Sequence, residues 1–319
     1  MPFLSCCHLG RDVCEVLGMG KNMKKNRYNE LNYHLMLLPG MIILIMFAII
    51  PMFGIVIAFQ NFIPTRGVFH SPWVGLDNFK YMFQMPDSMH VFRNTIVIAI
   101  LKIIANLMVP LVFALLLNEL RHRFIKRASQ TIIYLPYFLS WVILASIIQN
   151  ILDLDGPVNH LISFFGGKPV QFLISNIWFV PILVITETWK SMGFNTVIFL
   201  AALTGIDPTL YEASGIDGAG RFKQLRFITL PGITSTIVLL ATLSLGSILS
   251  ANFDQVFNLY NTLVYDTGDI IDTYVYRIGM AQAQFGLATA VGTLKSVVSF
   301  FLIILSYKLA SRYANYRIF

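Results

Sequence analysis

Six long apolar stretches, separated by polar segments, make up most of the chain. They cover residues 35–59, 94–117, 131–151, 177–203, 233–251 and 288–310. Each is close to the ~20 apolar residues that a helix needs to cross a bilayer. Prolines lie near or within several of them, and in a membrane helix a proline kinks the chain without forbidding the helix: Pro39, Pro51, Pro110, Pro136 and Pro181. The pattern predicts an all-α polytopic membrane protein with six transmembrane helices.

Composition favours the same class of protein. Only 12% of the 319 residues are charged and 56% are hydrophobic, with a mean hydropathy of +0.69. Soluble globular domains carry about 25% charged residues. The net charge of +7 would suggest nucleic acid as the partner of a soluble protein, but here its meaning depends on where the basic residues lie. We expect membrane lipid around this chain, and no nucleic acid.

The basic residues give the spans an orientation. With both termini in the cytoplasm, the inner segments hold fifteen lysines and arginines, the outer segments hold five and the spans hold three. Basic residues favour the cytoplasmic side of a membrane, so the reverse topology is rejected. We expect a cytoplasmic N-terminal tail over residues 1–30 and a transmembrane domain over residues 31–319.

The tail contains all three cysteines, Cys6, Cys7 and Cys14. They form no disulfide framework. A metal site or a lipid anchor is a possible use for them, but His8 alone does not complete a ligand set, so a tail with free thiols is favoured. Charged residues interrupt the first twenty positions, and these are therefore not a secretory signal.

Three long segments face outward in this topology, at residues 60–93, 152–176 and 252–287. They are too long to be simple hairpin turns, so we expect them to fold as short helices or caps. An outer face of this size suits the docking of a component delivered from outside.

The inner segment at residues 204–231 reads as two short helices joined by a bend. Asp207 followed by Pro208 is a typical N-cap and first-turn pair. Gly215 and Gly218 weaken and end the first helix, and a second helix begins near Gly220. The first helix carries an apolar stripe at helical spacing, formed by Leu210, Ala213 and Ile216. Such an element, just inside the bilayer, is suited to a pocket on a cytoplasmic partner.

This segment resembles the EAA loop of bacterial ATP-binding-cassette (ABC) import permeases. The resemblance is carried by Glu212-Ala-Ser-Gly-Ile-Asp217-Gly218-Ala219 and, at a fixed distance, by Phe227-Ile-Thr-Leu-Pro231. One departure is Ser214, where a second alanine is usual. The resemblance implies a type I importer permease fold and a coupling helix that sits in a cleft of a separate ATPase subunit. The coupling residues it implies are Asp207, Glu212, Ala213, Asp217, Gly218 and Ala219.

Further stretches resemble the subgroup that imports oligosaccharides or polysaccharide fragments, alginate included. They are residues 33–62, 71–79, 93–95, 115–120, 134–137 and 188–190. The resemblance implies a second permease subunit, an ATPase dimer and an extracytoplasmic solute-binding protein, in a bacterial cytoplasmic membrane. It also implies that this chain binds no cofactor, and that ATP and magnesium bind the ATPase.

Individual residues of the loop allow other interpretations. Glu212 could be an ordinary solvated charge, but its position favours contact with the ATPase. Asp217 could equally cap the second helix. Gly218 could be a plain turn glycine, which is compatible with the coupling role because the turn is what the ATPase would meet.

Polar and aromatic side chains within the spans are candidates for a substrate pathway. Glu187 and Lys190 share a helix face and could pair with each other, which is favoured over contact with substrate. The lysine excess in the spans, Lys102, Lys190 and Lys295 against one glutamate, would suit an acidic sugar, although lysines also snorkel to an interface. The pathway candidates are Glu187, Trp189, Lys190, Asn195, Asn150 and Trp141.

Other classes of protein fit less well. The chain has no Gly-x-x-x-x-Gly-Lys-Ser/Thr loop, no metal-ligand cluster and no catalytic constellation, so it is not expected to be an enzyme or to hydrolyse ATP. A secondary transporter would want an inverted repeat and intramembrane carboxylates for coupling. The alternatives that stay open are a permease for another solute and a secondary transporter.

Overall fold

The computed structural model describes residues 27–120, 122–246 and 249–314. The predicted free-thiol cysteines lie outside the described residues. The chain divides into two compact units, Met1–Gly54 and Ile55–Phe319. The predicted boundary between a tail and a transmembrane domain, at residue 30, stays a prediction, although residues 27–30 already belong to the first helix.

The first unit contributes one long apolar helix. Every residue from 33 to 53 is exposed, as expected for a helix surrounded by lipid. Pro51 cannot donate a backbone hydrogen bond, and a π-helical turn precedes it, in which the Ile50 N–H donates to the Ile45 carbonyl. The successive segments are α2 (Arg27–Leu44), η1 (Ile45–Ile49), α3 (Ile50–Met52) and η2 (Phe53–Phe59), the last crossing into the second unit.

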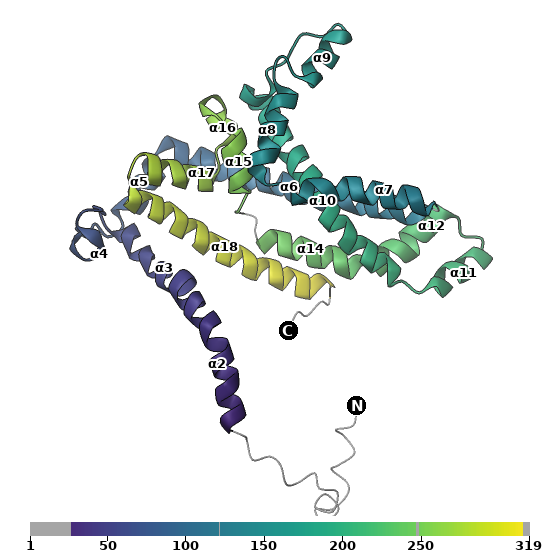
Figure 1. Cartoon of the computed structure of the whole chain (residues 1–319), viewed down its shortest axis with the longest axis horizontal. Helices are drawn as coiled ribbons and strands as arrows, with labels where there is room; N and C mark the ends of the chain where they lie inside the picture. The colour runs from purple at the N-terminus through teal and green to yellow at the C-terminus, as the bar shows by residue number, and fades with distance from the viewer. Residues whose placement is uncertain (1–26, 121, 247–248, 315–319) are drawn as a thin grey trace, which may run out of the picture. The chain divides into compact units, whose positions relative to one another are not determined.

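Four long helices form the centre of the second unit. They are α6 (Pro86–Glu119), α10 (Asn176–Thr204), α14 (Thr234–Gly246) and α18 (Phe285–Ala314). In Figure 1, α10 packs along α6 and α14 packs along α18. Pro110 and Pro181 lie inside α6 and α10 without ending them, which confirms the expectation that prolines are tolerated there.

The predicted third span, residues 131–151, is not one continuous helix. The structure has α7 (Arg123–Tyr134), a 3₁₀ turn η3 (Leu135–Phe138) and α8 (Trp141–Leu152). Pro136 lacks an N–H to continue α7, and Ser140 caps the new helix by accepting from the Ile143 N–H at 3.4 Å. The break lies against α10 at Gly193, where an added Cβ would lie 2.6 Å from the Ile133 carbonyl oxygen.

Short helices gather at the two ends of the central helices (Figure 1). At one end, called the α11 end, lie α11 (Pro208–Ile216), α12 (Arg221–Gln224), η5 (Leu225–Thr229) and α13 (Leu230–Gly232). At the other, called the α15 end, are α5 (Asp77–Gln84), α9 (Pro157–Phe164), η4 (Phe172–Ile174), α15 (Phe253–Leu259), η6 (Thr262–Val264), α16 (Tyr265–Gly268), α17 (Ile271–Tyr276) and η7 (Arg277–Ala281). The helix α4 (Gly67–His70) belongs to the first of the long segments. The expectation that the long segments fold as short helices is confirmed.

Buried side chains hold each end of the central helices together. Toward the α11 end, Leu117 of α6 packs with Phe199 and Leu203 of α10 and with Ile233. Toward the α15 end, the core includes Leu144 of α8, Phe179 and Leu183 of α10, and Val256 of α15. The α11–α13 segment is therefore attached to well-packed helices.

Membrane-crossing helices are consistent with the prediction of six spans. Within the described residues, four helices are long and apolar enough to cross a membrane, and two bent pairs raise the number to six if each pair is one span. The pairs bend by 65° between α10 and α11 and by 56° between α13 and α14. The fifth predicted span, residues 233–251, therefore begins at a bend, and the described part of its helix ends at Gly246.

Candidate functional site

Helix α11 begins as its sequence predicts. The Asp207 carboxylate accepts a hydrogen bond from the Thr209 N–H at 2.9 Å, and Pro208 occupies the first helical position. The backbone and side-chain hydrogen bonds from Thr209 lower the pKa of Asp207. The carboxylate is therefore ionised at neutral pH and fixes the point at which the chain turns out of α10.

The bend after α11 depends on Gly218. Its φ of +74° lies in the left-handed region, which glycine adopts without steric cost. The Ala219 N–H donates to the Ser214 carbonyl at 2.9 Å, and the Gly218 N–H donates to the Gly215 carbonyl at 3.1 Å. This pair of bonds is the Schellman motif that ends many helices. No atom lies within 4 Å of the position a Gly218 Cβ would take, so the bend is an open tip.

Asp217 does not cap the second helix. Asp217 is the C-cap residue of α11. Gly220 is the N-cap residue of α12, and no side-chain hydrogen bond caps that helix. The hypothesis of an Asp217 cap is therefore wrong, because the Schellman turn places Gly218 and Ala219 between Asp217 and Gly220, the N-cap of α12. The second helix does begin at the predicted glycine.

The apolar stripe of α11 faces solvent. Ile216 is 89% exposed, and Leu210, Glu212 and Ala213 are exposed as well. The exposed Leu210 and Ile216 leave apolar area on α11 available to a partner. Of the six predicted coupling residues, Ala219 is half-buried and the other five are exposed.

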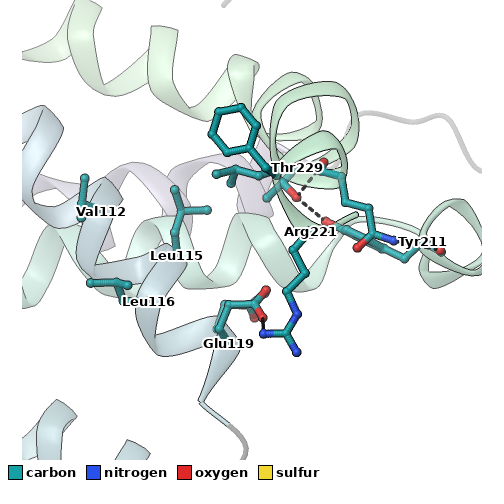
Figure 2. A pocket seen from close by; sticks show the side chains of 11 residues that line it. Val112, Leu115, Leu116, Glu119, Tyr211, Arg221 and Thr229 are labelled. Carbon is teal, nitrogen blue, oxygen red and sulfur yellow. Dashed lines mark hydrogen bonds and ion pairs between the residues drawn. The ribbon is translucent and has the colours of Figure 1, made fainter. Parts of the chain in front are cut away.

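Hydrogen bonds fasten α11 to the segment that follows. The Tyr211 hydroxyl lies 2.9 Å from the Thr229 hydroxyl (Figure 2), and Thr229 is buried. The Gln224 side-chain amide donates to the Ser214 hydroxyl at 2.9 Å, and Ser214 donates to the Tyr211 carbonyl at 2.9 Å. Ser214, the departure from the usual alanine, is therefore part of the joint between the two helices.

An apolar groove of about 480 Å³ separates the end of α6 from α12 (Figure 2). Val112, Leu115 and Leu116 of α6 line one wall. At the rim, Arg221 of α12 lies 3.6 Å from the carboxylate of Glu119. Both side chains are well exposed, and exposed ion pairs contribute less than about 1 kcal/mol. The hydrogen bonds between α11 and the segment that follows it therefore hold α12 more firmly than the ion pair to Glu119 does.

A polar cavity of about 140 Å³ lies among α6, α10 and the chain just before α15. In it, the Glu187 carboxylate accepts from the Asn252 amide at 2.7 Å. Asn252 has a left-handed backbone with φ of +65°, an uncommon conformation for a residue with a side chain. The cavity is lined by Ala99, Lys102, Ile103, Asn106, Glu187, Ser244, Ser250, Ala251 and Asn252.

Lys102 is the buried cation of this polar cavity. Its ammonium donates to the Ala251 carbonyl at 2.7 Å and to the side-chain oxygen of Gln255. Gln255 in turn donates to Thr186 at 2.8 Å. Buried charges need such partners because an unpaired one costs several kcal/mol. The network ties α6 to α10 and to the start of α15.

Glu187 and Lys190 do not pair, contrary to the favoured hypothesis. Lys190 instead donates to the Leu139 carbonyl and lies 5.3 Å from the Trp141 ring centroid. Trp141 is buried, so both residues pack at the break between η3 and α8. The i,i+3 spacing brings Glu187 and Lys190 near one face of α10, but each side chain reaches a partner on another element.

The other pathway candidates lie outside the polar cavity. Trp189 is exposed on a different face of α10 from Glu187. Asn195 donates weakly, at 3.4 Å, to the carbonyl of Asn106, which does line the cavity. Asn150 lines a separate cavity of about 360 Å³ beside η4, at the α15 end. The structure thus brings only Glu187 of the six candidates into the polar cavity itself.

Sequence reasoning named Lys102 but missed the other polar residues around Glu187. Lys102 and Asn106 lie four residues apart in an otherwise apolar span, and that spacing on one helix face is a signal that could have marked them. Asn252 and Gln255 gave no such signal, because they follow a span and their role depends on contacts with α10. Among the residues that the structure describes, no group of three or more His, Cys, Asp and Glu could hold a metal ion.

Each of the three lysines has a partner in the protein. Lys295 lies 2.5 Å from the Asp272 carboxylate, Lys190 donates to the Leu139 carbonyl, and Lys102 shares its cavity with Glu187. Hydrogen bonds to carbonyl groups leave the charge of a lysine in place, so the argument from charge for an acidic sugar stays a prediction.

Comparison with known proteins gives the family. Residues 107–315 match the family described as binding-protein-dependent transport system inner membrane component. The chain is 43% identical over 283 residues to the polygalacturonan/rhamnogalacturonan transport system permease protein YteP of Bacillus subtilis (strain 168), with 88% of each chain covered. It is 44% identical over 271 residues to protein LplB of the same organism, with 85% of each chain covered.

A solved structure has the same fold. A bacterial ABC transporter involved in the import of the acidic polysaccharide alginate contains a chain that matches with a TM-score of 0.84 and 34% identity, over 91% of this chain and 98% of that one. A bacterial alginate ABC transporter in complex with an alginate pentasaccharide-bound periplasmic protein contains a chain that matches with a TM-score of 0.83 and 34% identity, over 91% of this chain and 97% of that one. These matches confirm the family resemblance, and the chain belongs to the binding-protein-dependent inner-membrane permeases of ABC importers.

Proposed function

We propose that this chain is one of two permease subunits of an ATP-driven importer for oligosaccharides that contain uronic acids. Two observations support this proposal. The chain is 43% identical over 88% of its length to a polygalacturonan/rhamnogalacturonan permease, and it shares its fold with a chain of an alginate importer. A second permease, an ATPase dimer and a binding protein complete the assembly. The chain itself supplies a path and a mechanical link, and ATP with its magnesium binds the ATPase.

The mechanical link is the surface of α11. Asp207 fixes the start of the helix, Gly218 forms its open tip, and the exposed Ile216 offers apolar area to a cleft. The hydrogen bond that joins Tyr211 to Thr229, the last residue of η5, carries a push on α11 into α13 and α14 as a rigid body. Movement of packed helices between two arrangements is how such a push opens one side of a permease and closes the other.

The path for sugar includes the polar cavity of Glu187, Lys102 and Asn252. Carboxylate, ammonium and carboxamide groups can each exchange a protein hydrogen bond for one to a sugar hydroxyl, and a few such groups in an otherwise apolar site are typical of binding pockets. The cavity holds one cation and one anion, so it does not select substrates by charge. Selection for uronate is assigned to the binding protein.

The orientation follows from the basic residues, with α11 and both termini in the cytoplasm of a bacterium and the α15 end outside. A cysteine placed at Gly218, in a chain whose Cys6, Cys7 and Cys14 are replaced, should react with a membrane-impermeant maleimide in inside-out vesicles and not in intact cells. Labelling in intact cells would reverse the topology.

Transport tests the substrate class. The complex, extracted gently with its co-purifying ATPase and partner permease, is reconstituted with its binding protein in proteoliposomes. Uptake of labelled oligogalacturonates is compared with uptake of maltooligosaccharides of equal length. ATP-dependent uptake of the uronate series alone supports the proposal. Uptake of the neutral series alone refutes the uronate assignment, and purification without any ATPase refutes the importer.

Two substitutions at Glu187 test the cavity. Glu187→Gln keeps an oxygen that accepts a hydrogen bond and removes the charge, whereas Glu187→Leu removes both. If hydrogen bonding carries sugar through the cavity, the glutamine variant retains uptake and the leucine variant loses it. Normal uptake by the leucine variant, at equal amounts of assembled complex, would remove the cavity from the path.

A further inference from the structure

A continuous row of aromatic rings lies at the α15 end, directly after the polar cavity. The rings of Phe253 and Phe257 stack at 5.0 Å between centroids, and Tyr276 meets Phe257 edge-on at 4.9 Å. Tyr260 extends the row from Phe257 at 6.0 Å, and Tyr265 follows at 5.3 Å. These five residues, called the aromatic ladder, come from α15 and its C-cap residue Tyr260, from α16 and from α17.

The aromatic ladder is open rather than buried. Phe257 is 36% exposed and Tyr276 is 42% exposed, and the other three rings are half-buried. In contrast, the aromatic side chains of Phe179 and Phe199 in the core are fully buried. Rings that contact one another and still present their faces form a ready surface for a flat, partly apolar ligand.

The surroundings of the aromatic ladder are polar. Asp254 is exposed on the neighbouring face of α15, and the Gln149 amide from α8 donates to the Asn258 carbonyl at 2.9 Å. Aromatic faces beside carboxamide and carboxylate groups are the combination that recognises a ligand with both C–H faces and hydroxyls.

The ladder does not select by charge. Arg277 lies over the Tyr265 ring at 4.2 Å, but its guanidinium is held by the buried Asp269 at 2.7 Å. The carboxylates of Asp254 and Asp266 are exposed beside Phe253 and Tyr265. An interfacial belt of single aromatic anchors does not account for the mutual stacking of the rings. Burial raises the pKa of Tyr260, so its hydroxyl stays protonated and able to donate.

The position of the aromatic ladder connects it to the path. Asn252, which binds Glu187 in the polar cavity, is the residue before Phe253. We propose that the aromatic ladder binds the ring faces of an oligosaccharide at the outer mouth and guides the chain into the polar cavity. This inference rests on the proposed function and adds a sugar-binding surface of this chain's own.

The test is uptake by the full reconstituted complex with Phe257→Ala, Tyr276→Ala and the double variant. We expect KM for the oligosaccharide-loaded binding protein to rise about two- to tenfold for each single variant, the range for loss of one aromatic stacking contact, and more for the double. Phe257→Trp and Tyr276→Phe keep a ring and should retain the wild-type KM. Phe164→Ala removes an 82% exposed ring of α9 at the same end and serves as the matched control.

The outcomes separate this inference from the function on which it rests. A wild-type complex that imports no oligosaccharide sinks the proposed function. A wild-type complex that imports, with unchanged KM in the double variant, sinks the aromatic ladder alone. A loss of ATPase stimulation by the sugar-free binding protein in the alanine variants would make the row a docking surface for that protein, and would also overturn the inference.

Discussion

Gly218 offers a direct test of the link between α11 and an ATPase. Its φ of +74° lies in the left-handed region, and no atom lies within 4 Å of an added Cβ. Gly218→Val therefore meets no clash within this chain but must either adopt a strained backbone or change the turn. The left-handed conformation costs an L-residue roughly 1–2 kcal/mol.

That strain is large enough to alter the tip. A difference of 1–2 kcal/mol changes a population by a factor of about 5–30, so Gly218→Val shifts the equilibrium away from the Schellman turn by about that factor. A loosened or enlarged tip should fit poorly into a cleft. We expect sugar uptake to fall while ATP hydrolysis continues, so that the ratio of sugar imported to ATP hydrolysed drops about tenfold.

Two further variants separate shape from strain. Asparagine tolerates the left-handed region, so Gly218→Asn adds a side chain with little strain. Gly166 has φ of +80° and equally open space, but lies after α9 at the other end of the molecule. Gly166→Val thus carries the same strain away from α11, and should leave the ratio unchanged.

The assay measures uptake and phosphate release in the same proteoliposomes, at matched amounts of assembled complex. A normal ratio in Gly218→Val would refute the assignment of the tip to the ATPase contact. A ratio lowered equally by Gly166→Val would show that general strain is responsible. A low ratio in Gly218→Asn as well would indicate that the cleft excludes any side chain at this position.

Three further predictions concern the attachments. Tyr211→Phe removes the hydrogen bond to buried Thr229, so local opening of α12 should become roughly fivefold more frequent, as read by deuterium exchange; unchanged exchange contradicts the joint. Glu119→Ala breaks an exposed ion pair to Arg221 worth less than about 1 kcal/mol, and should leave both exchange and uptake unchanged. Burial raises the pKa of Asp269 above 3.8 despite its ion-paired arginine. A raised pKa adds to the free energy of unfolding below pH 3.8, and this contribution is lost as the pH rises through the folded-state pKa. The melting temperature of wild type relative to Asp269→Asn should therefore rise as pH falls from 7 toward 4, and a constant difference would contradict the raised pKa.

Local signals in the sequence predicted the loop well. Asp207, Pro208 and Gly218 act within one turn of their own positions, through a capping hydrogen bond, a fixed φ and a left-handed backbone. Such effects need no distant partner. The start of α11, its end and the bend before α12 were therefore predictable residue by residue, as were most of the apolar spans.

Contacts between distant segments set the limit of prediction. The break in the third span needs Pro136, but it also needs the close approach of α10 at Gly193, which no local pattern indicates. Glu187 finds Asn252, 65 residues away, instead of its neighbour Lys190. Long polar side chains choose among all the carbonyls and amides within reach, and the tertiary fold decides which those are.

The bond between Ser214 and Gln224 has a consequence for how the loop can change over time. In a permease with the usual alanine at position 214, the amide at position 224 would lose its short hydrogen-bond acceptor and keep only the Tyr211 carbonyl at 3.4 Å. Selection to keep glutamine there would weaken. Positions 214 and 224 should then covary among related permeases. Glutamine at position 224 should be common where position 214 is serine, and less common where position 214 is alanine.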